Sequence, residues 1–231
     1  MGTSCLCGMG EYSRAKQAEV VQTSATTLPQ SLYNKEDLEL IELTFLKTID
    51  IIFDLKDCSN NKSKKVINIS TVPQEFRIFY DCEGEIPLIT PKDYLKRIGD
   101  YFGCTSYCYV IALMYIERFI SRYNIYMKEF HLACFDQFTC YRLYLVALVV
   151  ATKIYGNDRY CTNKYYAQVG GITTTEINAL ERKFLRLMGF GDVRDLTLSI
   201  TKEDFDSFVI RLRAEGESLK NKYPNLFADM K

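Results

Sequence analysis

Apolar side chains recur at three- and four-residue spacing along most of the chain, which is the pattern of amphipathic helices. The first such stretch begins at Lys35, and Asn34 is its expected N-cap. Residues 1–30 are rich in Gly, Ser, Thr and Gln without apolar periodicity, so we interpret them as a disordered tail. The polar stretch 57–65 ends the helix, and 31–87 therefore comprises an N-terminal helix and an extended connector.

Further helices follow, and local signals mark where several of them begin. Thr90 followed by Pro91 predicts one start, because Thr caps a first turn and Pro suits the first helical position. Thr173 with Glu176 forms a capping-box pattern at another start. The apolar stripes predict helices over 91–102, 106–122, 138–154, 163–168 and 174–188.

The segment 138–154 differs from the others because it is apolar on nearly all sides over 143–151. A helix of that kind must be covered by neighbours all round, so we expect it at the centre of the fold. A last, short helix begins near Thr201 within 191–231, which we divide into a C-terminal helix and a tail. The pattern therefore predicts an all-α protein built around one buried helix.

Composition disfavours most enzyme chemistry. The chain has 231 residues, with 29 Lys and Arg against 29 Asp and Glu, so its formal net charge is zero. This balance argues against a nucleic-acid-binding protein held by a general basic surface. His131 is the only histidine. A histidine-based zinc site or a catalytic Cys–His or Ser–His pair is therefore improbable, because it would have to rely on this single imidazole. No phosphate-loop, nucleophile-elbow or zinc-protease motif occurs, so we expect neither a metal nor a cofactor.

Nine cysteines are scattered along the chain, and the first thirty residues contain no apolar secretory segment. Without export, disulfides are not expected, and the cysteines are interpreted as reduced core or surface thiols. The alternative is an enzyme with a cysteine site, which a depressed thiol pKa would reveal. The longest apolar run, 143–151, is about half of the ~20 residues that a membrane span needs.

The start of the chain offers one other route to a membrane. Gly2 with nearby Cys5 and Cys7 resembles a dual acylation signal, although Leu6 stands where the usual pattern has Ser or Thr. No polybasic stretch supplies a second attraction to lipid. A disordered tail that begins with Met-Gly is the favoured interpretation, so we expect membrane contact only if this N-terminus is acylated.

Several short segments occur in an informative order. They include Tyr-Ile-Glu-Arg-Phe over 115–119, a buried helix ending near Lys153, and Tyr-Tyr-Ala-Gln-Val-Gly-Gly over 165–171. Together they resemble the cyclin box of the P/U-type cyclins, the group that includes the phosphate-pathway cyclins. The resemblance covers about residues 88–190, with the helix from Lys35 as an N-terminal extension. No single segment would be specific, but the combination is.

The resemblance implies a five-helix cyclin fold that binds and activates a cyclin-dependent protein kinase as a heterodimer. In this family a Lys at the end of the third box helix and a Glu in the fifth meet the αC-helix region of the kinase. These positions match Lys153 and Glu181. Such an activator holds the αC helix inward so that the active-site Lys–Glu pair of the kinase forms. It acts by binding the active conformation of the kinase more tightly than the inactive one, so we expect a non-catalytic regulator.

Aromatic side chains are expected to complete the kinase contact, although each of them also suits a protein core. They are Tyr155, Tyr160, Tyr165, Tyr166 and Phe184. Cyclins usually carry Asp where Glu117 stands, and this carboxylate is expected to form an internal ion pair with an Arg such as Arg97. The Met-Arg-Ala-Ile-Leu docking patch of the A-type cyclins is not found in the sequence, which puts that route of substrate recruitment in doubt.

The 191–231 segment is too short for a second five-helix repeat, so we expect a single cyclin box in a protein of the cytoplasm or nucleus. The sequence does not name the kinase, its substrates, or the process, whether cell cycle or phosphate signalling. An alternative is a cyclin-fold adaptor in transcription or nucleic-acid-associated complexes, without kinase activation. That function would require a basic face and salt-dependent DNA binding. The neutral charge balance argues against it, and no nucleic-acid partner is expected.

Overall fold

The computed structural model of the chain describes residues 33–58, 66–81, 84–156, 161–190, 197–224 and 226–227, and only the backbone of 55–58. The α-helices in these residues are α2 (Lys35–Cys58), α3 (Pro91–Tyr101), α4 (Ser106–Glu129), α5 (Cys140–Tyr155), α6 (Asn163–Gly170), α7 (Thr174–Leu187) and α8 (Lys202–Lys222). Two short 3-10 helices, η3 (Ile69–Thr71) and η4 (Arg77–Phe79), lie in the connector before α3. The all-α class is confirmed, and α3 to α7 are the five helices expected over 88–190.

Local capping chemistry sets where several helices begin. At α2, the side-chain oxygen of Asn34 accepts a hydrogen bond of 2.8 Å from the backbone N–H of Asp37. Thr90 caps α3 in the same way. At α7, Thr173 and Glu176 each accept from the other's backbone N–H, at 3.1 and 2.8 Å. These three helix starts were predicted from sequence and are confirmed, because the chemistry involves residues only three apart.

The end of α4 differs from the prediction. The helix continues past Arg122 to Glu129. The side chains of Tyr123 and Tyr126 lie in this added stretch, and both rings pack against the ring of Phe76 at centroid distances of 5.2 and 5.9 Å. Packing against the connector therefore carries the helix beyond the point where polar residues suggested an end.

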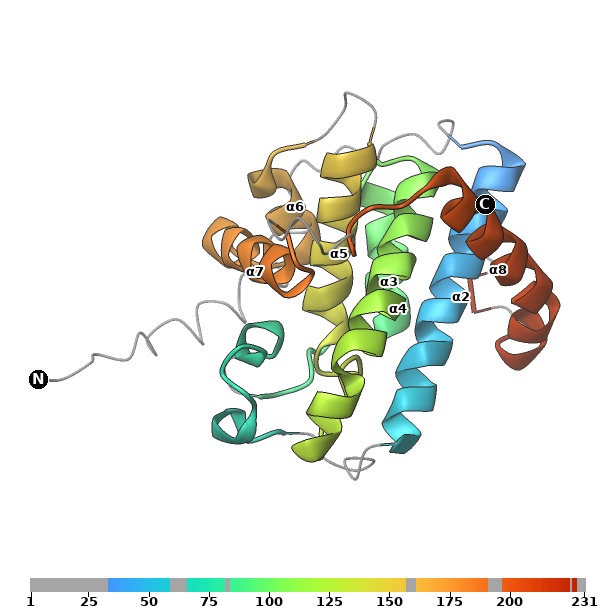
Figure 1. The fold of residues 1–231 in the computed structure, drawn as a ribbon. Helices are drawn as coiled ribbons and strands as arrows, with labels where there is room; N and C mark the ends of the chain where they lie inside the picture. The colour runs from blue at the N-terminus through green and yellow to red at the C-terminus, as the bar shows by residue number, and fades with distance from the viewer. Residues whose placement is uncertain are drawn as a thin grey trace, which may run out of the picture.

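The helix α5 occupies the centre of the molecule, as predicted. Every residue from Leu143 to Thr152 is buried. In Figure 1, α4 lies along one side of α5, and α6 and α7 cover the other side. None of the helices in the described part of the chain is long and apolar enough to cross a membrane.

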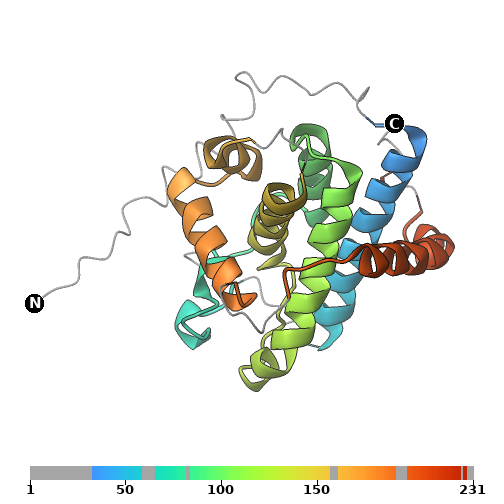
Figure 2. The same ribbon diagram turned by 45° about the horizontal axis from the view of Figure 1, so that its top comes forward.

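The C-terminal helix is longer than the short helix expected, with 21 residues. It runs across α2 and also contacts α4 (Figure 2). Its buried residues recur at three- and four-residue spacing, which makes one face of the helix part of the core. They are Phe208, Leu212, Gly216 and Leu219. The approach is closest at Gly216, where a Cβ atom would lie 3.0 Å from a methyl carbon of Leu43 on α2.

Charged side chains fasten α8 to the rest of the fold. Arg211 contacts Glu117 of α4 at 2.6 Å, and Lys222 contacts Asp50 of α2 at 2.5 Å. We call these two ion pairs, together with the buried face of α8, the C-terminal clamp. The hydrogen bond with Asp50 is the main cause that raises the pKa of Lys222.

The partner of Glu117 is a correction to the sequence analysis, which paired it with Arg97. Glu117 accepts from Arg211 of α8, whereas Arg97 donates to the backbone carbonyl of Gln168 at the end of α6 at 2.9 Å. The predicted pair is wrong because α3 packs mainly against α2, α5 and α6, so Arg97 reaches α6 rather than α4.

Candidate functional site

The two charged residues expected to contact a partner meet in the structure. Lys153 lies in the last turn of α5, and its Nζ atom contacts the two carboxylate oxygens of Glu181 on α7 at 2.6 and 2.7 Å. The side chains keep exposed fractions of 32% and 16%. Sequence reasoning placed both residues at a functional surface without predicting that they bind each other. The structure thus presents a donor and an acceptor together at one point of the surface.

A third helix contributes to this arrangement. The side-chain amide of Asn163, the first residue of α6, donates to Glu181 Oε2 at 2.8 Å and to Asn178 Oδ1 at 2.7 Å. We call Lys153, Glu181 and Asn163 the polar cluster, with Asn178 as a neighbour outside it. Sequence analysis missed Asn163 and Asn178, because a hydrogen bond between α6 and α7 leaves no trace in helical periodicity.

Exposed apolar side chains lie at or just after the ends of two helices that carry the polar cluster. Ile154, directly after Lys153, is 45% exposed, and Phe190, just after the end of α7, is 68% exposed. Sequence analysis did not select them, although an apolar residue next to a helix-ending Lys is a usable signal. Apolar anchors beside a few charged groups are typical of a protein–protein interface.

Two of the predicted aromatic contacts are half-buried and already use their hydroxyl groups. The Tyr155 hydroxyl accepts from the backbone N–H of Ile200 at 2.7 Å and donates to the carbonyl of Leu198 at 3.2 Å. The Tyr165 hydroxyl donates to the carbonyl of Tyr101, and burial raises the pKa of Tyr165. Their rings can contribute a contact surface, but their hydroxyl groups hold the fold together.

Two other predicted contacts need correction, because Tyr166 and Phe184 are core residues. The ring of Tyr166 stacks on Phe102 at 4.7 Å, and the ring of Phe184 stacks on Phe119 at 5.8 Å. Both belong to the apolar stripe of their helices, which faces α3 or α4. The remaining predicted positions, which are Tyr160 and the acylation candidates Gly2, Cys5 and Cys7, lie outside the described residues.

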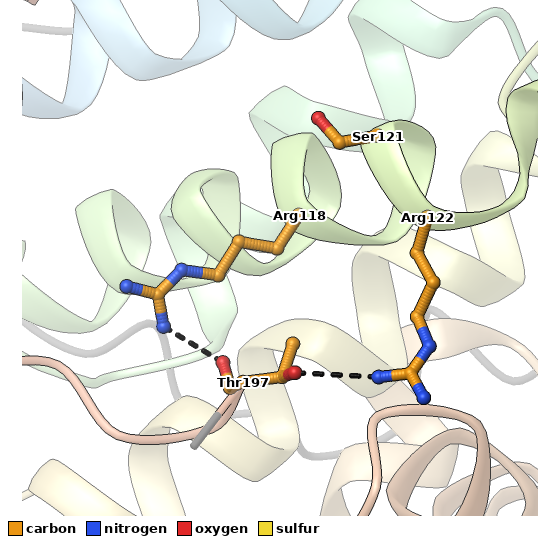
Figure 3. Close-up of a pocket in the computed structure, with 4 residues that line it drawn as sticks. All are labelled: Arg118, Ser121, Arg122 and Thr197. Carbon is orange, nitrogen blue, oxygen red and sulfur yellow. Dashed lines mark hydrogen bonds between the residues drawn. The ribbon is translucent and has the colours of Figure 1, made fainter. Parts of the chain in front are cut away.

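A shallow hollow of about 420 Å³ lies beside α4, lined by Arg118, Ser121, Arg122 and Thr197. Figure 3 shows both arginines reaching toward Thr197. Arg118 donates to the backbone carbonyls of Thr197 and Ser199 at 2.7 Å each, and Arg122 donates to the Thr197 hydroxyl at 3.3 Å. The guanidinium groups thus hold the segment that leads into α8, and we assign the hollow to the fold.

The cysteine side chains that the structure describes differ in pKa and in burial. Burial raises the pKa of the Cys104, Cys134 and Cys140 thiols, and also that of the half-buried Cys161. A hydrogen bond from Cys104 is the main cause that lowers the pKa of Cys108 to about 6, but this side chain is fully buried. No described cysteine combines a low pKa with the exposure that a nucleophile needs.

Comparison with known proteins decides the family. The family model described as Cyclin matches residues 12–191, which is most of the chain. The chain belongs to the cyclin family. Among its relatives, Cyclin-P3-1 of Oryza sativa subsp. japonica is 28% identical over 211 residues, covering 90% of this chain and 79% of the relative. Cyclin-U4-1 of Arabidopsis thaliana is 33% identical over 157 residues, covering 68% of each chain.

A shorter match fits the same group. Cyclin-U3-1 of Arabidopsis thaliana is 36% identical over 104 residues, covering 45% of this cyclin and 43% of the relative. The predicted likeness to P-type and U-type cyclins is confirmed. Cyclins are generally non-catalytic regulators that act with cyclin-dependent kinases. Lys153 lies in the last turn of the third helix of the box, and Glu181 lies in the fifth.

Proposed function

We propose that this cyclin is the activating subunit of a cyclin-dependent protein kinase, and that the αC region of the kinase docks on the polar cluster and Ile154. The observation that carries the proposal is the partly exposed Lys153–Glu181 pair, which two box helices bring together at 2.6 Å. It lies at the end of the most buried helix of the fold, so its backbone has a rigid support.

The chemistry of the pair suits a peptide partner. An ammonium group has three hydrogen-bond donors, and a carboxylate has about four acceptor positions. Lys153 and Glu181 can therefore bind each other and still offer donors and acceptors to the backbone of a docked helix. Ile154 supplies the apolar contact next to them. A kinase held in this way is activated only insofar as the cyclin binds its active conformation more tightly than its inactive one. To shift the ratio of active to inactive kinase from 1:99 to 99:1, the two affinities must differ by about 10⁴-fold.

The test uses a panel of purified cyclin-dependent kinases, with affinity measured by biolayer interferometry and activity on a Ser-Pro peptide. Lys153→Glu and Glu181→Lys should each reduce affinity for the bound kinase by about 100-fold or more, because each places like charges together and removes a partner contact. Kinase activation should fall in parallel. Lys202→Glu on α8, which also reverses an exposed and ion-paired Lys, is the matched control and should change neither.

Thermal unfolding of every variant shows whether a lost signal reflects lost folding. The proposal is contradicted if both charge reversals bind and activate the kinase like the natural chain. It is also contradicted if no kinase of the panel is bound.

A further inference from the structure

We propose that Asn163 is a positioning residue of the kinase-binding site, which holds the Glu181 carboxylate in place before a kinase arrives. This inference rests on the proposed function, since it concerns the same pair of charged residues. It assigns a task to the first residue of α6, a helix that also packs against α3 and α5. The argument depends on how the Asn163 amide is oriented and on what surrounds it.

Both hydrogens of the Asn163 amide are committed to one face of α7. Nδ2 donates to Glu181 Oε2 at 2.8 Å and to Asn178 Oδ1 at 2.7 Å. Asn178 and Glu181 are three residues apart in the helix, so their side chains are neighbours. A single amide group therefore ties together two acceptors, and one of them is the carboxylate that binds Lys153.

The other end of the amide shows what fixes its orientation. The side-chain oxygen Oδ1 of Asn163 is buried and has no hydrogen-bond partner within the described part of the chain. Buried acceptors usually have a donor, so an exception needs a reason. A rotated amide would bring this oxygen against the oxygens of Asn178 and Glu181, which repel it. The acceptors on α7 therefore dictate the orientation of the amide, even though its own oxygen is left unsatisfied.

The location of Asn163 in α6 makes this anchor firm. Asn163 is the first residue of the helix, directly after the N-cap Thr162, whose hydroxyl accepts from the backbone N–H of Tyr165 at 3.4 Å. The N-terminal end of α6 accordingly lies beside Glu181. Glu181 thus has Lys153 on one side and the start of α6 on the other.

Fixing Glu181 in advance matters for binding. A free glutamate side chain samples several rotamers, and a partner must order it at a loss of affinity. The Asn163 amide removes that loss, because the carboxylate is already placed when the kinase docks. We expect Asn163→Ala to weaken kinase binding by up to about 12-fold while Lys153 and Glu181 are both still present.

The first experiment is a double-mutant cycle with the kinase of the panel that binds most tightly. Asn163→Ala should weaken binding in the natural background, but it should have no further effect when Glu181→Ala is already present. Asn178→Ala is the matched control, since it removes the other acceptor of the same amide and leaves the bond to Glu181. We expect it to change the affinity by less than about threefold.

Complementation separates positioning from a merely structural role. Asn163→Asp should bind more weakly than Asn163→Ala, because it sets two carboxylates against each other. Combined with Glu181→Gln, it restores a hydrogen bond between positions 163 and 181 with donor and acceptor exchanged. The double variant should therefore bind the kinase more tightly than Asn163→Asp alone. A variant that only damaged the fold would not be rescued in this way.

A readout without the kinase completes the test. In NMR spectra, the side-chain NH₂ protons of Asn163 should exchange slowly with solvent in the natural chain and rapidly in Glu181→Ala. If their exchange does not depend on Glu181, or if Asn163→Ala binds like the natural chain, the inference is overturned and the proposed function is unaffected. If Lys153→Glu also leaves binding intact, the proposed function itself fails.

Discussion

The polar cluster and the C-terminal clamp contain the same kind of bond in different surroundings. Lys153 meets Glu181 at 2.6 Å in the cluster, and Arg211 meets Glu117 at 2.6 Å in the clamp. The surroundings differ. The ion pairs of the clamp rim a buried apolar face of α8, whereas Lys153 of the cluster is followed directly in the chain by the exposed Ile154. The geometry of an ion pair alone does not tell whether it serves the fold or a partner.

The expected energies of ion pairs and of apolar burial explain how the two regions differ in their contribution to stability. A partly exposed ion pair contributes about 0–1 kcal/mol to folding, whereas burial of apolar surface contributes about 25 cal/mol per Å². The stability of the clamp therefore comes mainly from the side chains beneath it, such as Phe208 and Leu212, which are buried. The task proposed for the cluster is instead to offer its partly exposed charges to a partner.

The largest expected effect is the unfolding of the protein at alkaline pH, which disrupts both the C-terminal clamp and the core. Burial raises the pKa of Tyr115, whose hydroxyl donates to the carbonyl of Leu198 in the segment leading to α8. Burial likewise raises the pKa of Tyr33, Tyr80, Tyr94, Tyr109, Tyr141, Tyr144 and Tyr166. In the unfolded chain these groups ionise near pH 10. The stability that these neutral hydroxyl groups contribute is therefore fully present below about pH 10. It is lost as the pH rises from about 10 toward the higher pKa values of the folded state.

Each of these tyrosines should lower the free energy of unfolding by up to about 1.4 kcal/mol per pH unit above pH 10. We expect cooperative unfolding between about pH 10 and 12, with circular dichroism and tyrosinate absorbance changing together. Tyr115→Phe should reduce the number of protons released on unfolding in this pH range by about one, so the free energy of unfolding should fall less steeply with pH. Gradual ionisation of these tyrosines with the helices intact would contradict the prediction.

The next effect concerns the packing of the clamp alone. Gly216→Leu should lower the free energy of unfolding by about 2–3 kcal/mol, because its side chain would enter the space of Leu43. Gly216→Ala is the matched control. Its Cβ atom would lie 3.0 Å from Leu43, but Ala gains up to about 1 kcal/mol of helix propensity, so we expect a change within about 1 kcal/mol. Urea unfolding measures both.

Kinase affinity of the folded fraction should be the same for both Gly216 variants, since the polar cluster lies on α5, α6 and α7. A loss of affinity at unchanged stability would mean that α8 belongs to the kinase interface. The comparison between the two regions would then fail.

A smaller effect is expected from the outer bonds of the clamp. Arg211→Ala removes the contact with Glu117 and the stacking of the guanidinium group on the ring of Phe208 at 4.6 Å. Both groups are partly exposed, so the free energy of unfolding should fall by about 0.5–1.5 kcal/mol. Arg213→Ala, at an exposed position of the same helix, controls for the loss of an arginine. Equal effects of the two substitutions would show that the Glu117 pair contributes nothing.

The sequence predicted what is local and missed what is distant. Helix starts at Thr90 and Thr173 follow from residues three apart, and the burial of α5 follows from its apolar composition. Glu117 and Arg211 are 94 positions apart, and no spacing rule relates two helices whose crossing is unknown. Arg97 was therefore the wrong partner.

The candidate site divides in the same way. Lys153 and Glu181 are predicted site residues because the cyclin resemblance marks their positions, whereas the contact of Asn163 depends on how α6 meets α7. Tyr166 and Phe184 were assigned to the surface because an aromatic residue suits an interface and a core equally well. Only the packing against Phe102 decides the case of Tyr166.

The smallest expected effect on folding is at the polar cluster, where the expected effect on binding is large. Lys153→Met keeps the length of the side chain and leaves the hydrogen bond from Asn163 to Glu181 in place. The free energy of unfolding should change by less than about 1 kcal/mol, because the Lys153–Glu181 pair is partly exposed. Kinase affinity should nevertheless fall more than about tenfold, since a donor to the partner is lost. Urea unfolding and biolayer interferometry on the same preparation measure both quantities. If Lys153→Met unfolds the protein as readily as Gly216→Leu does, the pair serves the fold after all, and the cluster and the clamp do not differ in purpose.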